Sequence, residues 1–339
     1  EALSGSSGRL VDGDTGMASV EQAADDGLDA EIRGFVRMMT QRWRQHPPLD
    51  QVPPAEARRI AEKVRAPLTR GGPLMARTSE HRIVTPHGAV RIRVLDPTGR
   101  GPQPALVYLH GGGWTIFSLD THDRVMREYA ARAGVVVVGV DYALSPEVRF
   151  PHALDEILAV IRWLRSRGGE VGVDPQRIAL GGDSAGAAMT IASCVQLRDA
   201  GEADAVRAML LNYGAYDPRC DSESHRRYGE GGYMWGPDEM PAFWRNYLGD
   251  TPPTDPLACP VHADVRGLPP AFSAIADCDV MFDESVAMAE KLRRAGVRSH
   301  VAIYAGATHS FLEAVSIARI SDRAFAEASR WLSDTLRHG

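Results

Sequence analysis

"RIALGGDSAGAAMT", residues 177–190, places a single serine among very small neighbours. An apolar, strand-like run ends at Gly182, and small residues typical of a buried helix follow Ser184. A nucleophile on a sharp strand-to-helix turn needs such neighbours, because larger side chains beside it would collide. An ordinary glycine-rich turn has a similar sequence, and the Gly-x-Ser-x-Gly pattern alone is weak evidence for a nucleophile. The surrounding segments therefore have to decide between the two interpretations.

Short apolar runs recur on both sides of this stretch, separated by segments of helical length. They are "ALVYLH" (105–110), "GVVVVGVDY" (134–142), "RIALGG" (177–182), "RAMLLNY" (207–213), "PAFSAIAD" (270–277) and "HVAIYAG" (300–306). Runs that are apolar throughout are typical of strands covered on both faces, so the sequence predicts an α/β fold with a largely parallel sheet. The predicted helices between the strands are residues 122–133, 152–166, 185–199 and 283–295, with a last helix near 318–337.

Segments that lack this alternation of apolar runs and helical segments predict the domain organisation. Residues 1–16 are rich in Gly, Ser and Asp without periodicity, so we expect a disordered or appended tail. Residues 17–75 contain two amphipathic helical patterns, at 19–43 and 54–68, which we interpret as N-terminal cap helices. Residues 76–339 form the core, which begins with an antiparallel strand pair around the turn at 86–88. The aromatic-rich stretch at about 216–250 is too long for a plain connection, and we expect it to be a cap insertion.

Composition and charge exclude several classes of function. The chain has 339 residues, 44% of them hydrophobic and 24% charged, and a formal net charge of −6. Its basic residues are scattered among acids, so we expect no nucleic-acid partner. No apolar run approaches the roughly 18 residues of a membrane span, and the start has no signal pattern, so we expect a cytoplasmic protein. The four cysteines have no metal-ligand spacing, so we expect free thiols and no metal: Cys194, Cys220, Cys259 and Cys278.

A second motif, "YLHGGGW" at residues 108–114, follows an earlier predicted strand. Three consecutive glycines let a backbone approach a ligand closely and turn its N–H groups toward it. A phosphate-binding loop would have the same property, but both of the usual phosphate-loop spacings are absent. The pattern therefore favours a loop that binds an oxyanion.

Two further polar residues follow predicted strands. His309 comes shortly after "HVAIYAG", and Asp279 likewise follows "PAFSAIAD". Each of them alone is more often a capping or solvated group than a catalytic one. Serine, then aspartate, then histidine is nevertheless the chain order of one known type of catalytic triad. Their joint placement after strand ends favours Ser184, Asp279 and His309 as nucleophile, acid and base.

From about residue 75 to its end, the chain resembles the hormone-sensitive-lipase-like family of α/β-hydrolase esterases, in its GDSAG branch. Five matches carry the resemblance: "HGGGW" (110–114), "DYALSPE" (141–147) with "FPHALDE" (150–156), "GDSAG" (182–186), "DCDVMFDE" (277–284) and "YAGATHSF" (304–311). The resemblance implies a mostly parallel eight-stranded sheet flanked by helices, with a helical cap. It also implies the triad of Ser184, Asp279 and His309 and oxyanion donors in the backbone N–H groups of Gly112, Gly113 and Ala185. His110 is implied to be structural.

Three departures from the family pattern concern loops near these residues. Ala143 stands where the family usually has Arg, and Ser310 stands where it usually has Gly after the histidine. Residues 280–282 replace the usual residues after the acid. These changes leave the triad residues in place but put the support of their loops in question.

The predicted function is that of a serine carboxylesterase acting on small-molecule esters with short to medium acyl chains through an acyl-enzyme, without metal or organic cofactor. Family members often form homodimers, which we expect here as well. We expect five aromatic residues to form the pocket walls: Trp114, Phe117, Tyr216, Trp235 and Trp244. A deacetylase, lactonase or amidase acting on a natural product would use the same triad. A non-catalytic small-molecule receptor is the remaining alternative, and the intact triad argues against it.

Overall fold

One eight-stranded sheet forms the centre of the molecule in a computed structural model that describes residues 26–338. The strand order is β1-β2-β4-β3-β5-β6-β7-β8, with β1 and β2 antiparallel to their neighbours and the other pairs parallel. The strands are β1 Arg77–Thr85, β2 Gly88–Asp96, β3 Gln103–Leu109, β4 Val136–Asp141, β5 Val173–Asp183, β6 Ala208–Asn212, β7 Ala271–Ala276 and β8 Ser299–Tyr304. The prediction of a mostly parallel eight-stranded sheet flanked by helices is confirmed.

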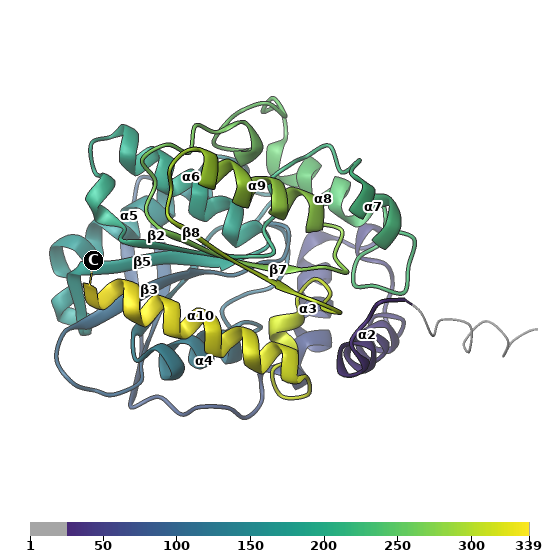
Figure 1. Ribbon diagram of the computed structural model, residues 1–339, viewed down its shortest axis with the longest axis horizontal. Coiled ribbons are helices and arrows are strands. Elements are labelled where there is room, and N and C mark those ends of the chain that lie inside the picture. The colour runs from purple at the N-terminus through teal and green to yellow at the C-terminus, as the bar shows by residue number, and fades with distance from the viewer. Residues whose placement is uncertain (1–25, 339) are drawn as a thin grey trace, which may run out of the picture.

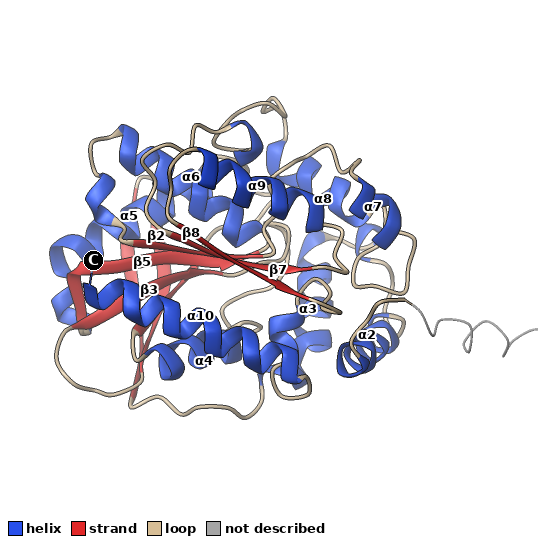
Figure 2. Ribbon diagram, viewed as in Figure 1, coloured by secondary structure: helices blue, strands red, loops and turns tan. Residues whose placement is uncertain are grey.

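Helices cover both faces of this sheet (Figures 1 and 2). On one side lie α4 (Asp123–Ala133) and α10 (Arg319–His338), and on the other lie α5 (His152–Arg167), α6 (Ala185–Asp199) and α9 (Phe282–Arg294). All five correspond to helices predicted from the sequence, with ends that differ by one residue or none. Short 3₁₀ turns link the elements at Leu49–Gln51, Ala66–Thr69, Gly168–Val171, Ala203–Ala205, Pro260–His262 and Phe311–Ala314 (η6).

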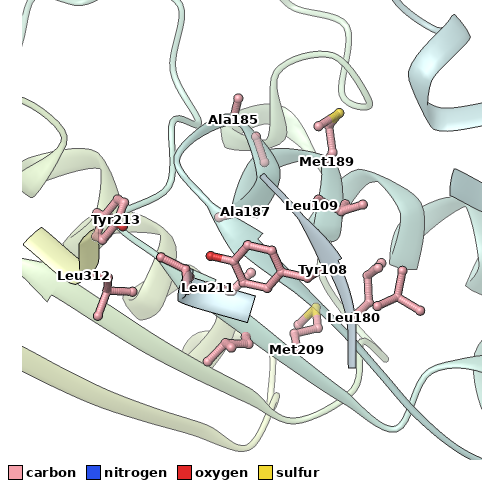
Figure 3. Packing of buried hydrophobic residues seen from close by; sticks show 14 of the residues in the cluster. Tyr108, Leu109, Leu180, Ala185, Ala187, Met189, Met209, Leu211, Tyr213 and Leu312 are labelled. Carbon is pink, nitrogen blue, oxygen red and sulfur yellow. The ribbon is translucent and has the colours of Figure 1, made fainter. Parts of the chain in front are cut away.

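The two-sided cover explains why most of the strands are apolar throughout. All residues of β6 and β7 are buried, as is β4 apart from Asp141. Figure 3 shows Tyr108, Leu180 and Met209 together in this packing, one from each of three adjacent strands. The two edge strands differ: most residues of β1 are not buried, and in β8 Val301 and Ile303 are 45% and 53% exposed.

Four further helices gather at one end of the sheet (Figure 1). Two precede the core, α2 (Ala30–Trp43) and α3 (Pro54–Arg65), and two follow β6, α7 (Glu223–Tyr228) and α8 (Glu239–Leu248). The first helix was expected to start near residue 19, but in the described part it begins at Ala30, where the carboxylate of Asp29 accepts hydrogen bonds from the N–H groups of Glu31 and Ile32. The predicted tail at 1–16 lies outside the described residues.

Within residues 26–338, no helix is both long enough and apolar enough to cross a bilayer.

Candidate active site

Ser184 lies on the one-residue turn between β5 and α6. Its backbone has φ 55° and ψ −116°, a conformation that residues with a side chain rarely adopt. The turn approaches the end of β3 so closely that a Cβ on either Gly182 or Gly186 would collide with the carbonyl oxygen of Leu109. The small residues around the serine are therefore required by close contact with the neighbouring strand, and they leave Oγ free at the end of the sheet.

The two other predicted triad residues lie beside Ser184. The Oγ of Ser184 is 3.0 Å from Nε2 of His309, and Nδ1 of His309 is 2.8 Å from Oδ2 of Asp279. All three side chains are buried. The second carboxylate oxygen of Asp279 accepts a hydrogen bond of 3.0 Å from the N–H of Met281, which fixes the plane of the carboxylate. This arrangement can move a proton from a hydroxyl to an imidazole supported by a carboxylate.

The glycine loop after β3 lies against the same turn. Gly112 and Gly113 have φ of 114° and 57°, which turns successive peptide groups of the loop. Among the described residues, the N–H groups of both glycines lack a hydrogen-bond acceptor, and so does that of Ala185 in the open first turn of α6. These are the three donors predicted for an oxyanion.

A buried polar cluster beneath the loop was not predicted from the sequence. Asp183 accepts hydrogen bonds through Oδ1 from the Tyr108 hydroxyl at 2.8 Å and from the N–H of Gly111 at 3.1 Å. Its Oδ2 lies 3.2 Å from Nε2 of the buried His122. The carboxylate thus ties the glycine loop to the residue before Ser184. The aspartate of the "GDSAG" motif could have indicated that this residue supports the glycine loop. No pattern in the sequence indicated that its partner beside α4 would be His122.

The charges of this cluster follow from its burial and pairing. Burial acts to raise the pKa of Asp183, but the His122 charge and two side-chain hydrogen bonds outweigh it and lower the pKa. Burial conversely acts to lower the pKa of His122, and Asp183 raises it overall. The neighbouring His110, which is buried and lies beside His122, has a pKa lowered to about 3. His110 is therefore neutral near pH 7, in agreement with the structural role implied by the resemblance.

The cavity beside Ser184 is small, about 10 Å³, which is room for a single water molecule. Of the five predicted wall residues, Phe117 and Trp235 line it, together with Met240 and Phe243 of the stretch 216–250. The Trp235 ring meets the imidazole of His309 edge-on, with centroids 6.4 Å apart.

Trp114, Trp244 and Tyr216 do not line this cavity. Trp114 and Trp244 are buried in an aromatic stack, in which the Trp114 ring lies parallel to that of Tyr247 with centroids 4.2 Å apart. Tyr216 lines a separate cavity of about 320 Å³ beyond Glu284. The aromatic residues of the insertion thus divide between its own packing and the wall of the site.

The structure also answers the questions raised by the departures from the family pattern. Ser310 has φ 62°, so a residue with a side chain adopts a left-handed conformation where the family usually has glycine. Val280 and Met281 are almost fully buried behind the acid. The N–H of Ala143 donates to the carboxylate of Glu156 at 2.8 Å, so this loop is held by its backbone.

Within residues 26–338, no cluster of three or more His, Cys, Asp or Glu side chains has the arrangement of a metal site.

Comparison with known proteins identifies relatives of the whole core. A protein family described as the alpha/beta hydrolase fold matches residues 106–313. An acetyl esterase of Salmonella paratyphi A is 34% identical over 252 residues, which cover 74% of this chain and 77% of that enzyme. Among solved structures, an α/β hydrolase from the metagenome of Lake Arreo has a TM-score of 0.85 at 32% identity, and an esterase of Pyrobaculum calidifontis has a TM-score of 0.82 at 30% identity. Both alignments cover 91% of this chain and 98% of the other.

Proposed function

This chain belongs to the α/β-hydrolase fold family and is a carboxylic ester hydrolase of its hormone-sensitive-lipase-like branch, and we propose that Ser184, His309 and Asp279 carry out its reaction. The observation that carries the proposal is the continuous hydrogen-bonded relay, 3.0 Å from Ser184 Oγ to His309 Nε2 and 2.8 Å from His309 Nδ1 to Asp279.

In the proposed mechanism, Ser184 Oγ attacks the ester carbonyl carbon while His309 Nε2 takes its proton. The electron pair of the carbonyl moves to the oxygen, which the N–H groups of Gly112, Gly113 and Ala185 stabilise. The tetrahedral intermediate then expels the alcohol, whose oxygen receives the proton from His309, and an acyl-serine remains. Water, deprotonated by His309 Nε2, then attacks the acyl-serine. The second tetrahedral intermediate breaks its bond to Ser184 Oγ, which takes the proton back from His309, and the carboxylic acid leaves.

We propose short acyl groups, acetyl first, as the preferred substrates. The large side chains of Phe117, Trp235 and Phe243 line the cavity beside Ser184 and leave little length for an acyl chain. The Salmonella relative is an acetyl esterase by name, which supports the same acyl size.

We also propose that residues 17–75 and 216–250 act as a cap, and for the insertion the lining of the same cavity supports this. Phe243 of α8 approaches the glycine loop so closely that a Cβ on Gly113 would collide with its ring. Residues of the insertion therefore form part of the wall at the nucleophile.

A cytoplasmic location and a homodimer are further proposals. All four cysteines, which lie in the described part of the chain, are free thiols, as is usual in a reducing compartment. The edge strand β8 exposes Val301 and Ile303, and such an edge can pair with that of a second copy. A monomer mass by light scattering would contradict the homodimer. Purification of the protein from a secreted fraction would contradict the cytoplasmic location.

The first experiment is hydrolysis of p-nitrophenyl esters from acetate to dodecanoate by wild type and Ser184→Ala. We expect a maximum at acetate or another short acyl chain, and a loss of about 10⁴-fold or more in kcat for the variant. Ser193→Ala is the matched control, because this serine is also buried on α6 and its Oγ has no hydrogen-bond partner among the described residues.

Three outcomes would contradict parts of the proposal. Activity retained by Ser184→Ala would remove the serine from the mechanism. A maximum at long chains would contradict the proposed acyl size. No turnover of any simple ester by the folded wild type would favour a deacetylase, lactonase or amidase with a special substrate, or a receptor.

A further inference from the structure

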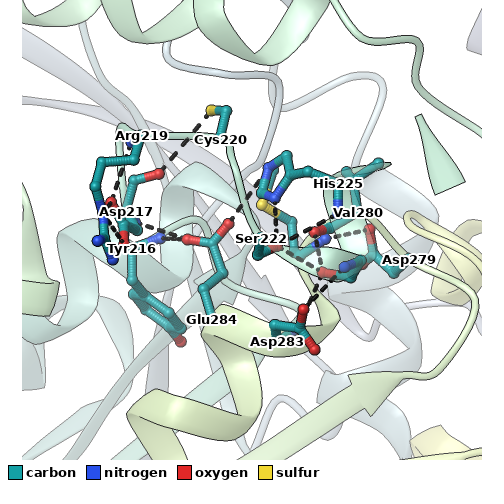
Figure 4. A network of polar contacts seen from close by, with 12 residues as sticks. Tyr216, Asp217, Arg219, Cys220, Ser222, His225, Asp279, Val280, Asp283 and Glu284 are labelled. Atoms are coloured by element: carbon teal, nitrogen blue, oxygen red, sulfur yellow. Dashed lines mark hydrogen bonds and ion pairs between the residues drawn. The ribbon is translucent and has the colours of Figure 1, made fainter. Parts of the chain in front are cut away.

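Two consecutive acids at the start of α9, Asp283 and Glu284, bind the two ends of the segment 216–225, which leads from β6 into the cap insertion (Figure 4). Glu284 binds the first end, because its Oε2 accepts hydrogen bonds from the N–H groups of Tyr216 and Asp217 at 2.6 and 2.7 Å. Burial raises the pKa of Glu284 well above its ordinary value.

Asp283 binds the second end through Ser224 in the first turn of α7. The N–H of Ser224 donates to Oδ2 of Asp283 at 2.8 Å, and the N–H of Asp283 donates back to Oγ of Ser224 at 3.2 Å. The Ser224 hydroxyl donates its own proton to the carbonyl oxygen of Val280 at 2.8 Å. We call these three hydrogen bonds the clasp. Ser224 is only 3% exposed, so water does not replace them easily.

The clasp holds the loop that carries the proposed triad acid. Val280 directly follows Asp279, and the next N–H along the chain, that of Met281, donates to Oδ1 of Asp279. The carbonyl bound by Ser224 thus lies between the acid and the donor that orients it. The other carboxylate oxygen of Asp279 faces His309. A shift of the 280–283 backbone would therefore rotate the carboxylate relative to the imidazole.

We infer that Ser224 is a positioning residue of the reaction, through which the cap insertion holds Asp279 in line with His309. This inference rests on the triad proposed above. The cap then has two roles, because it closes the site and also keeps the acid loop in its working geometry.

Ser224→Ala tests the inference, with Ser222→Ala as the matched control. Ser222 lies in the same turn of α7, where its Oγ accepts a hydrogen bond from the N–H of His225 and lies 3.0 Å from Oγ of Ser224, but it forms none of the three hydrogen bonds of the clasp. For p-nitrophenyl acetate we expect Ser224→Ala to lower kcat by about 10- to 100-fold, with little change in KM, since misplaced catalytic groups affect the chemical step. Ser222→Ala should keep kcat within about twofold of wild type.

Titration of the active sites separates positioning from general damage to the fold. A p-nitrophenyl phosphonate that phosphonylates the serine irreversibly, followed to completion, counts the sites that react. We expect the concentration of reactive sites in Ser224→Ala to match that of the protein, while kcat for each site falls. A loss of sites in proportion to the loss of kcat, or equal effects of Ser224→Ala and Ser222→Ala, would overturn the inference.

Hydrogen exchange of the peptide around residues 278–285 tests the clasp without catalysis. Ser224→Ala should speed exchange at the amides of Met281 and Asp283, whereas Ser222→Ala should not. Asp283→Ala should resemble Ser224→Ala, and the double variant should be less than additive, because both residues belong to one network. An inactive wild type would reject the proposed function, whereas unchanged exchange and activity in Ser224→Ala would reject the clasp alone.

Discussion

Glu284 is a buried carboxyl group whose Oε1 has no hydrogen-bond partner among the described residues, although Nε2 of His225 lies 3.9 Å from it. Its Oε2 accepts hydrogen bonds from two backbone N–H groups, but burial dominates and raises the pKa of Glu284 well above its ordinary value. The folded protein therefore keeps the proton on this group at pH values where the unfolded chain releases it. Its contribution to stability is complete below the pKa of the unfolded chain and is lost as the pH rises through the folded pKa.

Glu284→Gln tests this titration. Glutamine keeps an oxygen for the N–H groups of Tyr216 and Asp217 and cannot ionise. We expect the variant to be more stable than wild type above about pH 5, with a difference in unfolding free energy that grows by about 1.4 kcal/mol per pH unit until the folded pKa is reached. Urea denaturation between pH 4 and 8 measures it, with the exposed Glu223→Gln as control for net charge. A difference that does not change with pH would contradict the assigned titration.

Helix α3 is held to the core by a buried ion pair at its last residue. Nη1 of Arg65 lies 2.9 Å from Oε2 of Glu313 in η6, and the side chains are 0% and 2% exposed. The guanidinium also lies over the ring of Phe117, 4.8 Å from its centroid. Since η6 follows His309 by two residues, the pair joins a helix of the proposed cap to the loop of the proposed base.

Arg65→Met should leave the Glu313 carboxylate buried without its partner. We expect a loss of about 3–5 kcal/mol in unfolding free energy, and partial recovery in Arg65→Met with Glu313→Leu, because an apolar pair removes the unpaired charge. Arg59→Met on the same helix is the matched control, since Arg59 is 70% exposed and its ion pair with Glu56 contributes less than about 1 kcal/mol. Equal losses for Arg65→Met and Arg59→Met in urea unfolding would refute the buried pair as a stabilising contact.

In the molecule as a whole, four helices gather at one end of the covered sheet (Figure 1). Ser184 lies between β5 and α6 of the core, whereas the insertion supplies Trp235, Met240 and Phe243 of the cavity wall. The wall and Ser184 thus come from different parts of the fold. Substitutions in the wall can therefore change the accepted acyl group while the relay stays intact.

Trp235→Ala should enlarge the cavity and favour longer acyl chains. We expect the ratio of kcat/KM for p-nitrophenyl hexanoate to that for the acetate to rise about 10-fold or more, since each methylene placed in a fitting pocket changes the ratio by about 10-fold or more. Trp163→Ala on α5, which does not line the cavity, is the matched control. An unchanged ratio in Trp235→Ala would show that Trp235 does not limit the acyl group.

The alternation of apolar runs and helical segments predicted the order of elements in the core, because these patterns act over a few residues at a time. The glycines at 182 and 186 predicted the turn at Ser184 for the same reason, since they relieve crowding within a short stretch of chain. The chain order of Ser184, Asp279 and His309 selected three residues that do lie within hydrogen-bond distance. The turns after the strands thus sufficed to select three side chains that meet, and their roles in the reaction stay a prediction.

Only the tertiary structure decided which distant side chains meet. Asp183 with His122, Arg65 with Glu313 and Ser224 with Asp283 are 61, 248 and 59 residues apart, and no local pattern pairs them. The same holds for the aromatic residues, of which Trp235 reaches the cavity while Trp114 and Trp244 pack together. The physical reason is that burial and the pairing of polar groups depend on the shape of the whole core, whereas the sequence by itself determined the elements and the turns that end them.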